Sequence, residues 1–241
     1  MKQIWIITKR EIRSFFDSLM AYIMIVLFLG FSGFFTWIYG SDIFFTGQAS
    51  LQVFFQMAYW TLFFFIPALT MRLIAEEKKT GTIELLFTRP LSEWQLVVGK
   101  FLATLILIAI ALALTLPYYF TVWSLGPIDH GAVWTGYLGL ILMSATYISI
   151  GIFASSITNN QIVSFLLALT IGIAFHVIFG VLSQATSGVL AQVFNYLDLG
   201  THFESISRGV IDTTDLIYFL SITFLGLFAT EATLAKRNLV D

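Results

Sequence analysis

The chain has 241 residues, of which 58% are hydrophobic, 17% aromatic and 11% charged, and its formal net charge is −2. A mean hydropathy of +0.89 excludes an ordinary water-soluble domain and indicates a polytopic membrane protein. Because it has no cysteine, the chain has no disulfide, thiolate metal site or cysteine nucleophile. The small net charge gives no sign of a nucleic-acid partner.

Residues 1–17 are predicted to form an interfacial elbow helix. A helical wheel places apolar residues on one arc and basic residues on the opposite arc, namely Ile4, Trp5, Ile12, Phe15 and Phe16 against Lys2, Lys9, Arg10 and Arg13. Ile6 and Glu11 depart from this pattern. A basic flank that only orients the first span is an equally good interpretation.

Six apolar segments follow, and each reaches the roughly 20 residues that a helix needs to cross a bilayer core. They cover residues 18–39, 51–71, 95–123, 132–157, 161–182 and 216–235. Residues 18–241 are therefore predicted to form one all-α, six-span membrane domain. An even number of spans leaves both termini on the same side.

The basic residues predict which side that is, because Lys and Arg are retained in the cytoplasm. All but one of the 12 Lys and Arg residues fall on the side of the termini, and the exception is Arg208. Both termini are therefore expected to be cytoplasmic.

The longest polar interruption on that side covers residues 72–94, between the second and third spans. A short helix is predicted within it, since Gly81 can begin a helix, Glu84 can reach the free N–H groups of its first turn, and Pro90 ends it. Ser92 and Gln95 are predicted to form a capping box that opens the third span.

The connections between the later spans differ in length. The three residues 158–160 predict a tight hairpin between the fourth and fifth spans, whereas residues 183–215 place apolar side chains at near-helical spacing. The longer segment predicts short re-entrant or interfacial helices before the sixth span, with a mobile loop as the alternative. Within it, Arg208 is expected to pair with Glu204 or with Asp212.

Ionisable residues are scarce within the spans. Only His176 lies well inside one, while Lys100 and Glu231 lie near span ends, where long side chains are expected to reach the interface. This scarcity argues against an ion-coupled secondary transporter. An intramembrane hydrolase that uses His176 is a remote alternative, because a polar residue at a helix interface explains it more simply.

A polar stripe of Gln52, Gln56 and Tyr59 runs along the second span. These side chains either face a transport pathway, together with His176, or lie at the wet end of a packed bundle. The chain has no G-x-x-x-x-G-K-[ST] phosphate-binding loop, so any ATPase must be another polypeptide.

The stretch EEKKTGTIELLFTRPLS at residues 76–92, followed by Gly99 and Lys100, resembles the membrane subunits of ABC-2 type ABC transporters. The resemblance implies an elbow helix, six spans, and a coupling helix that docks on a separate ATP-binding subunit. It also implies a multi-pass protein of the bacterial inner membrane that is not itself an enzyme and binds no cofactor. ATP and Mg²⁺ would be held by the partner.

The coupling residues expected from this resemblance are Glu76, Glu77, Gly81, Glu84, Leu85, Leu86, Phe87, Arg89 and Pro90. The apolar residues among them can fill a cleft of the ATPase while the charged ones contact its rim, as in other helix-in-groove complexes.

Residues 202–212, with Asp215, Tyr218 and Phe219, resemble more narrowly the gliding-motility-associated (GldF-type) permease of Bacteroidota. Permeases of copper-enzyme maturation share similar segments, so the substrate stays open. The resemblance implies a companion subunit with a large extracytoplasmic domain, or a second permease copy. The expected outer partner surface comprises His202, Glu204, Arg208 and Asp212. A non-transporting scaffold or mechanotransmitter coupled to the same ATPase is the alternative function.

Overall fold

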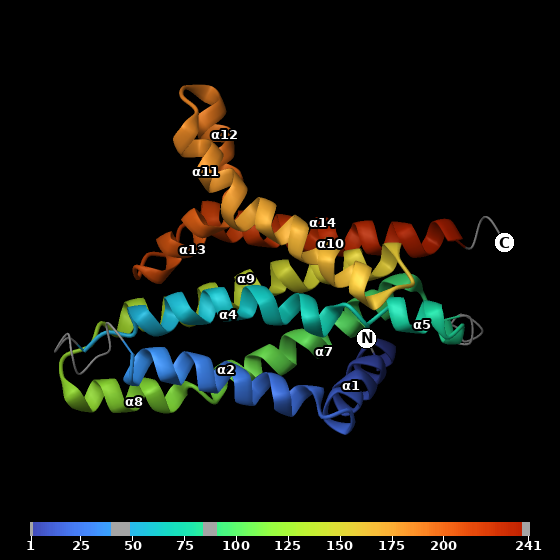
Figure 1. Ribbon diagram of the computed structural model, residues 1–241, viewed down its shortest axis with the longest axis horizontal. Helices are drawn as coiled ribbons and strands as arrows, with labels where there is room; N and C mark the ends of the chain where they lie inside the picture. The colour runs from blue at the N-terminus through green and yellow to red at the C-terminus, as the bar shows by residue number, and fades with distance from the viewer. Residues whose placement is uncertain (1, 40–48, 84–90, 238–241) are drawn as a thin grey trace.

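The computed structural model describes residues 2–39, 49–83 and 91–237, and within these ranges the chain is helical with no β-strand (Figure 1). In chain order the elements are α1 (Lys2–Asp17), α2 (Met20–Trp37), α4 (Gln52–Thr70), α5 (Ala75–Lys79), α7 (Glu93–Ala113), α8 (Leu116–Leu125), α9 (His130–Ile157), α10 (Gln161–Ile173), the π-helical turn η1 (Ala174–Ile178), α11 (Phe179–Ala185), α12 (Val189–Leu197), α13 (Leu199–Ser207) and α14 (Thr213–Arg237). The predicted all-α class is confirmed.

Six helical stretches in the described residues are long and apolar enough to cross a membrane, as predicted. They are α2, α4 with α5, α7 with α8, α9, α10 with α11, and α14. The third stretch breaks at Thr115, whose Oγ1 donates to Leu112 O at 2.6 Å. Pro117 lies in the first turn of α8, where its missing N–H costs no helical hydrogen bond.

The central helix is α9, which packs against α4, α7, α10, α13 and α14. Its glycines allow close approach: a Cβ at Gly136 would clash with the Phe55 ring, and one at Gly151 would clash with Thr70. The outer helices α2, α10 and α14 expose many large apolar side chains instead. Exposed apolar faces of this kind are what a membrane helix presents to lipid.

The two ends of the bundle differ in what they carry (Figure 1). One end, called the α5 end below, holds α1, α5, the α9–α10 connection and the C-terminal end of α14. The opposite end holds α8 and α13. The α9–α10 connection is the predicted tight turn, in which the Asn160 side chain accepts a hydrogen bond from Ile162 N at 2.9 Å.

The segment before α14 is helical, which resolves the alternative of a mobile loop. The fifth span passes through the π-helical turn η1 into α11, and α11 with α12 forms a hairpin that projects from the bundle (Figure 1). Phe179 and Phe194 stack across this hairpin with ring centroids 6.2 Å apart. The location of α12 and α13 relative to the membrane surface stays a prediction.

His202 does not lie on an outer surface as predicted, because it is buried with 5% of its surface exposed. Its Nδ1 lies 2.6 Å from Asp215 Oδ1, its Nε2 lies 3.0 Å from the carbonyl oxygen of Tyr196, and its ring stacks on Tyr218 at 3.9 Å. The Tyr218 hydroxyl donates to Leu197 O at 2.7 Å. These contacts attach α13 and the end of α12 to α14.

The other residues of the expected outer surface are exposed. Arg208 Nη2 lies 3.4 Å from Glu204 Oε2, so of the two predicted pairings the one within α13 is present. Asp212 instead accepts a hydrogen bond from Thr214 N at 2.8 Å. Both side chains of the Arg208–Glu204 pair are about two-thirds exposed, so the pair contributes at most about 1 kcal/mol.

The face of α1 that packs on the protein differs from the apolar arc of the wheel. Trp5, which lies on that arc, is exposed, as an apolar residue that an interfacial helix turns to the bilayer would be, and Ile6 is exposed as well. Ile7, Thr8, Glu11 and Phe15 form the buried face instead. Glu11 therefore does not violate the pattern of the buried face; it belongs to that face and is buried because it is paired.

Candidate functional site

Lys100 is the centre of a buried ionic cluster at the α5 end. Its ammonium group lies 2.7 Å from Glu77 Oε1, 3.3 Å from Glu11 Oε1 and 2.7 Å from Leu73 O. Only 1% of the Lys100 surface is exposed, so the expectation that its side chain reaches the interface is wrong. The cluster joins α1, α5 and the third span at one atom.

Gly99 explains how α1 comes close enough to join this cluster. A Cβ at Gly99 would lie 2.7 Å from the Ile7 side chain, so only glycine permits the approach of α1 to α7. Thr8 Oγ1 donates to Gly99 O at 3.1 Å across the same contact. Gly99 thus leaves the space that α1 needs to approach α7, and the neighbouring Lys100 binds the Glu11 carboxylate of α1.

Arg10 closes the cluster on the solvent side. Its Nη2 lies 2.5 Å from Glu11 Oε1 and 3.3 Å from Glu77 Oε1. Burial alone would raise the pKa of Glu11, but Lys100 and Arg10 outweigh that effect, so the pKa of this carboxyl lies below its ordinary value. Glu11 is therefore ionised at neutral pH, and the cluster contains two cations and two carboxylates.

A second set of contacts attaches α5 to the central helix. Ser155 Oγ of α9 accepts hydrogen bonds from Ile74 N at 3.1 Å and Ala75 N at 2.9 Å, and donates to Met71 O at 3.0 Å. The Lys78 ammonium donates to Ser156 O at the end of α9. The start of α5 is thereby fixed to the end of α9.

Gly81 follows Thr80, the C-cap of α5, and directly precedes the helical residues Thr82 and Ile83, so it lies where the coupling helix was predicted to begin. Its φ is +70°, a left-handed conformation that favours glycine at the end of a helix. Gly81 N donates to Lys78 O at 3.3 Å, which satisfies a carbonyl group of the last turn. Thr82 and Ile83 are helical again. Glu84, Leu85, Leu86, Phe87, Arg89 and Pro90, the other expected coupling residues in this region, lie outside the described residues.

The predicted capping box at the start of α7 is confirmed. Gln95 N donates to Ser92 Oγ at 3.2 Å, and Ser92 N donates to Gln95 Oε1 at 3.3 Å. The two bonds satisfy free donors of the first turn and fix where the third span begins.

Between α1 and α5 the cluster borders a polar groove of about 580 Å³. Its wall includes Arg72, whose guanidinium donates to Ser18 Oγ at 2.8 Å and lies over the Phe15 ring. Glu76 is an exposed residue of this wall, whereas Glu77 points inward to Lys100. Of the glutamates expected to contact a partner, two are described, and Glu76 is the exposed one of these two.

A family model described as ABC-2 family transporter protein matches residues 44–234. The chain belongs to this family. No curated protein matches it. As an ABC-2 membrane domain it is the permease subunit of an ABC transporter, and membership implies a separate ABC ATPase partner. Permeases of this family are normally not enzymes themselves.

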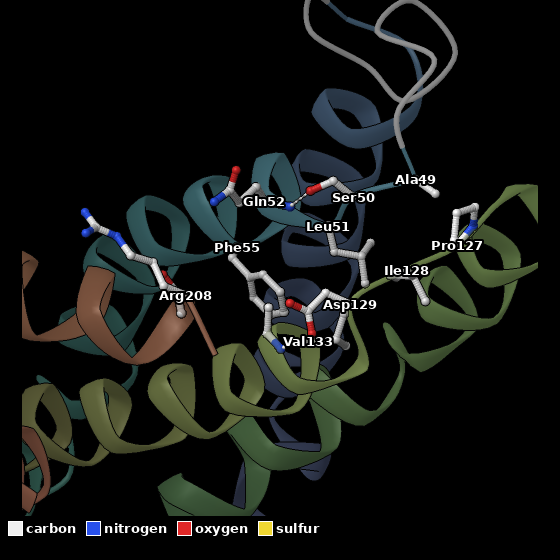
Figure 2. Close-up of a pocket in the computed structure, with 12 residues that line it drawn as sticks. Ala49, Ser50, Leu51, Gln52, Phe55, Pro127, Ile128, Asp129, Val133 and Arg208 are labelled. Atoms are coloured by element: carbon white, nitrogen blue, oxygen red, sulfur yellow. Dashed lines mark hydrogen bonds between the residues drawn. The ribbon is translucent and has the colours of Figure 1, made fainter. Parts of the chain in front are cut away.

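The ABC-2 permease has a second set of polar residues at the opposite end of the bundle. Gln52, Gln56 and Tyr59, the predicted stripe, line one cavity of about 580 Å³. A neighbouring cavity of about 400 Å³ shares Gln52 with it and holds Asp129 (Figure 2). The Arg208 side chain points away from Asp129 in Figure 2.

His176 lies behind this stripe in the π-helical turn. Its ring stacks on Tyr59 at 4.1 Å and on Phe63 at 4.5 Å, and its Nδ1 lies 2.5 Å from the Tyr147 hydroxyl. The interpretation of His176 as a polar residue at a helix interface fits these contacts, and no serine hydroxyl is among its hydrogen-bond partners in the described residues. Within the described residues no three His, Asp or Glu side chains converge to hold a metal ion.

The Lys100 cluster was not predicted from the sequence, because Glu77 and Glu11 lie 23 and 89 residues from Lys100 along the chain. One signal was available: Glu11 lay where the helical wheel of α1 should have been apolar. A carboxylate on the inner face of an interfacial helix requires a buried cation, and Lys100 is one of few candidates in the spans.

Proposed function

We propose that the ABC ATPase docks at the α5 end and moves the permease through α5. The observation that carries this proposal is the Lys100–Glu77 pair, because it joins the segment between the second and third spans to the body of the third span. A displacement of α5 by the ATPase would act directly on α7 and, through Glu11, on α1.

The hydrogen bonding of Glu77 favours a role for α5 as an element that moves during function. Glu77 Oε2 is buried and has no hydrogen-bond partner among the described residues. Buried polar atoms in this state are uncommon, and a contact that is completed only in another state of the protein is one explanation. We infer that docking rearranges the bonds of Glu77 while Lys100 stays in place.

Under this proposal the α5 end is cytoplasmic. The basic residues support this, because all but one of them are assigned from the sequence to the side of the termini. The arrangement of the helices agrees with it, because α1, α5 and the end of α14 lie at the same end of the bundle (Figure 1). The ATPase would contact Glu76 and residues 82–90, and would bind ATP and Mg²⁺ itself.

The proposal is tested by co-expressing the permease with its ABC ATPase and measuring the rate of ATP hydrolysis. Glu76→Arg reverses an exposed charge without touching Lys100, and it should lower both co-purification and stimulated hydrolysis. Asp212→Asn, at the other end of the bundle, should change neither. Equal stimulation by wild type and Glu76→Arg would remove Glu76 from the docking site.

A role in gliding motility is a finer proposal that rests on the resemblance of residues 202–212. In that stretch His202 serves an internal contact with Asp215, so only the exposed Glu204, Arg208 and Asp212 are open to a companion subunit or a second permease copy. Crosslinkers at these three positions should capture such a partner in cells. Their failure to capture any subunit would leave the segment as a connector within the permease.

A further inference from the structure

The cavity beside Tyr59 has the composition of a small-molecule site. It is formed by α4 and by the chain from α11 to α13, and its volume of about 580 Å³ lies in the range of small-ligand pockets. Its lining combines aromatic rings with polar side chains, among them Tyr59, Trp60, Phe203, Gln52, Gln56 and Gln184.

Asp198 supplies the charge that faces this cavity. Only 8% of its surface is exposed, and its Oδ2 accepts hydrogen bonds from Thr201 N at 2.9 Å and Thr201 Oγ1 at 2.7 Å. No described residue donates to its Oδ1, and this atom is not among the enclosed polar atoms that lack a partner. Asp198 lines the cavity, and its Oδ1 is free to accept a bond.

Gly200 keeps the space beside Asp198 open. A Cβ at Gly200 would lie 3.1 Å from the Tyr59 hydroxyl and 3.3 Å from Asp198 Oδ2, so both polar groups lie close to the same backbone position. Among the described residues the Tyr59 hydroxyl has no hydrogen-bond partner. A side chain at Gly200 would occupy the space between two groups that are both able to bind a ligand.

The charged residues that line the cavity indicate whether its ligand should be a cation or an anion. Its lining includes the carboxylates of Asp198 and Glu204 and, in the described part of the chain, no Lys or Arg. Glu204 is paired with Arg208, whereas Asp198 caps the first turn of α13 and has no Lys or Arg partner among the described residues. Buried carboxylates are normally paired, which makes a cation the matching ligand.

The aromatic rings favour an organic cation over a metal ion. Tyr59 stacks on both Phe203, at 4.8 Å, and His176, at 4.1 Å, so Trp60, which is 41% exposed, is the most open aromatic ring of the lining. An ammonium group is attracted to the faces of such rings, and a carboxylate next to them adds charge attraction. We propose that this cavity binds a small organic monocation, with its ammonium group at Asp198 and the aromatic rings and the glutamine amides around the remainder.

This inference adds a substrate class to the proposed function and rests on it for the claim that the ligand is transported. Binding itself needs no ATPase. Ligand binding is therefore measured on the purified permease alone. A failure of the ligand to bind is then distinguished from a failure of the ATPase to couple at the α5 end.

Choline and its uncharged carbon analogue 3,3-dimethyl-1-butanol are the probes, since they match in shape and differ in charge. Calorimetry on the permease in nanodiscs should detect choline at millimolar concentration and the neutral analogue at least tenfold more weakly. Asp198→Asn keeps an oxygen that can accept from Thr201 and removes the charge, so it should weaken choline binding at least tenfold. Asp212→Asn, which removes an exposed carboxylate outside the cavity, should leave it unchanged.

Three results would overturn the proposal. They are the absence of choline binding to wild type, equal binding of the neutral analogue, and equal weakening by Asp198→Asn and Asp212→Asn. Tyr59→Phe gives a second measurement that leaves the hydrogen bonds from Thr201 to Asp198 intact. It should weaken choline binding severalfold, while its unfolding temperature stays close to that of Asp212→Asn.

Discussion

The Lys100 ammonium lies 2.7 Å from Glu77 Oε1, although the two residues belong to different helices and the segment that joins them passes through the expected coupling region. Lys100 is buried and Glu77 is partly buried, and the pair is linked through Glu11 to the first helix. An ABC ATPase that displaces α5 would therefore pull on a charge pair that the third span holds.

Removing one member of this pair should be costly. Lys100→Met leaves Arg10 as the remaining cation for the two carboxylates of Glu11 and Glu77, so one negative charge is uncompensated. Loss of one partner of a buried pair costs about 3–5 kcal/mol, which is the upper bound here because Arg10 stays. Thermal unfolding in detergent should show a clearly lowered midpoint for Lys100→Met. The double variant Lys100→Met/Glu77→Gln should recover part of the loss, because one uncompensated charge is gone. A double variant less stable than Lys100→Met would contradict this reading of the cluster.

Glu11 should give the cluster a defined pH dependence. Its folded-state pKa is lowered, so the stability it contributes is present at neutral pH, persists down to its ordinary value of 4.5, and is lost as pH falls through the folded-state value. The difference in unfolding midpoint between wild type and Glu11→Gln should stay constant from neutral pH to about pH 5 and shrink below that. A difference that disappears already near pH 6 would mean that Glu11 is not held ionised.

Gly81 tests whether the geometry between α5 and residue 82 matters. Asn tolerates a positive φ and Val does not, so Gly81→Asn should be mild whereas Gly81→Val should strain the turn by about 1–3 kcal/mol. Stimulated ATP hydrolysis should fall for Gly81→Val and be largely retained for Gly81→Asn. Equal activity of the two variants, with equal protein levels in the membrane, would show that the turn does not transmit motion.

The fold was largely predictable because it rests on local signals. The six apolar stretches, the capping box of Ser92 and the short turn at residues 158–160 each depend on neighbouring residues, and the structure confirms them. The break at Thr115 was predictable as a kink from Pro117. The π-helical turn at His176 was not, because nothing in the local sequence distinguishes it from an ordinary span.

The sites were less predictable because they depend on contacts between distant elements. His202 was expected at the surface because polar residues surround it, yet Asp215 and Tyr218 of α14 bury it. Lys100 was expected at the interface because long side chains can reach it, yet two carboxylates hold it inside. In both cases the deciding partner lies on another helix, and one sequence does not reveal which helices meet.

The topology can be tested by labelling, since the chain has no native cysteine. Cysteines at Asp129 and Asp212 should react with an impermeant maleimide in intact spheroplasts, whereas cysteines at Lys79 and Lys236 should react only after lysis. All four positions are exposed, which Asp198 is not. Labelling at Lys79 in sealed cells would contradict the proposed cytoplasmic location of the α5 end.

The most direct test of the central claim is photo-crosslinking of the assembled transporter. A benzoylphenylalanine at Glu76, exposed on α5, and another at Asp212, exposed at the opposite end, are compared in the complex with the co-expressed ABC ATPase. We expect the probe at Glu76 to capture the ATPase subunit and the probe at Asp212 not to capture it. Capture of the ATPase from Asp212, with none from Glu76, would place docking at the wrong end of the bundle and contradict the account.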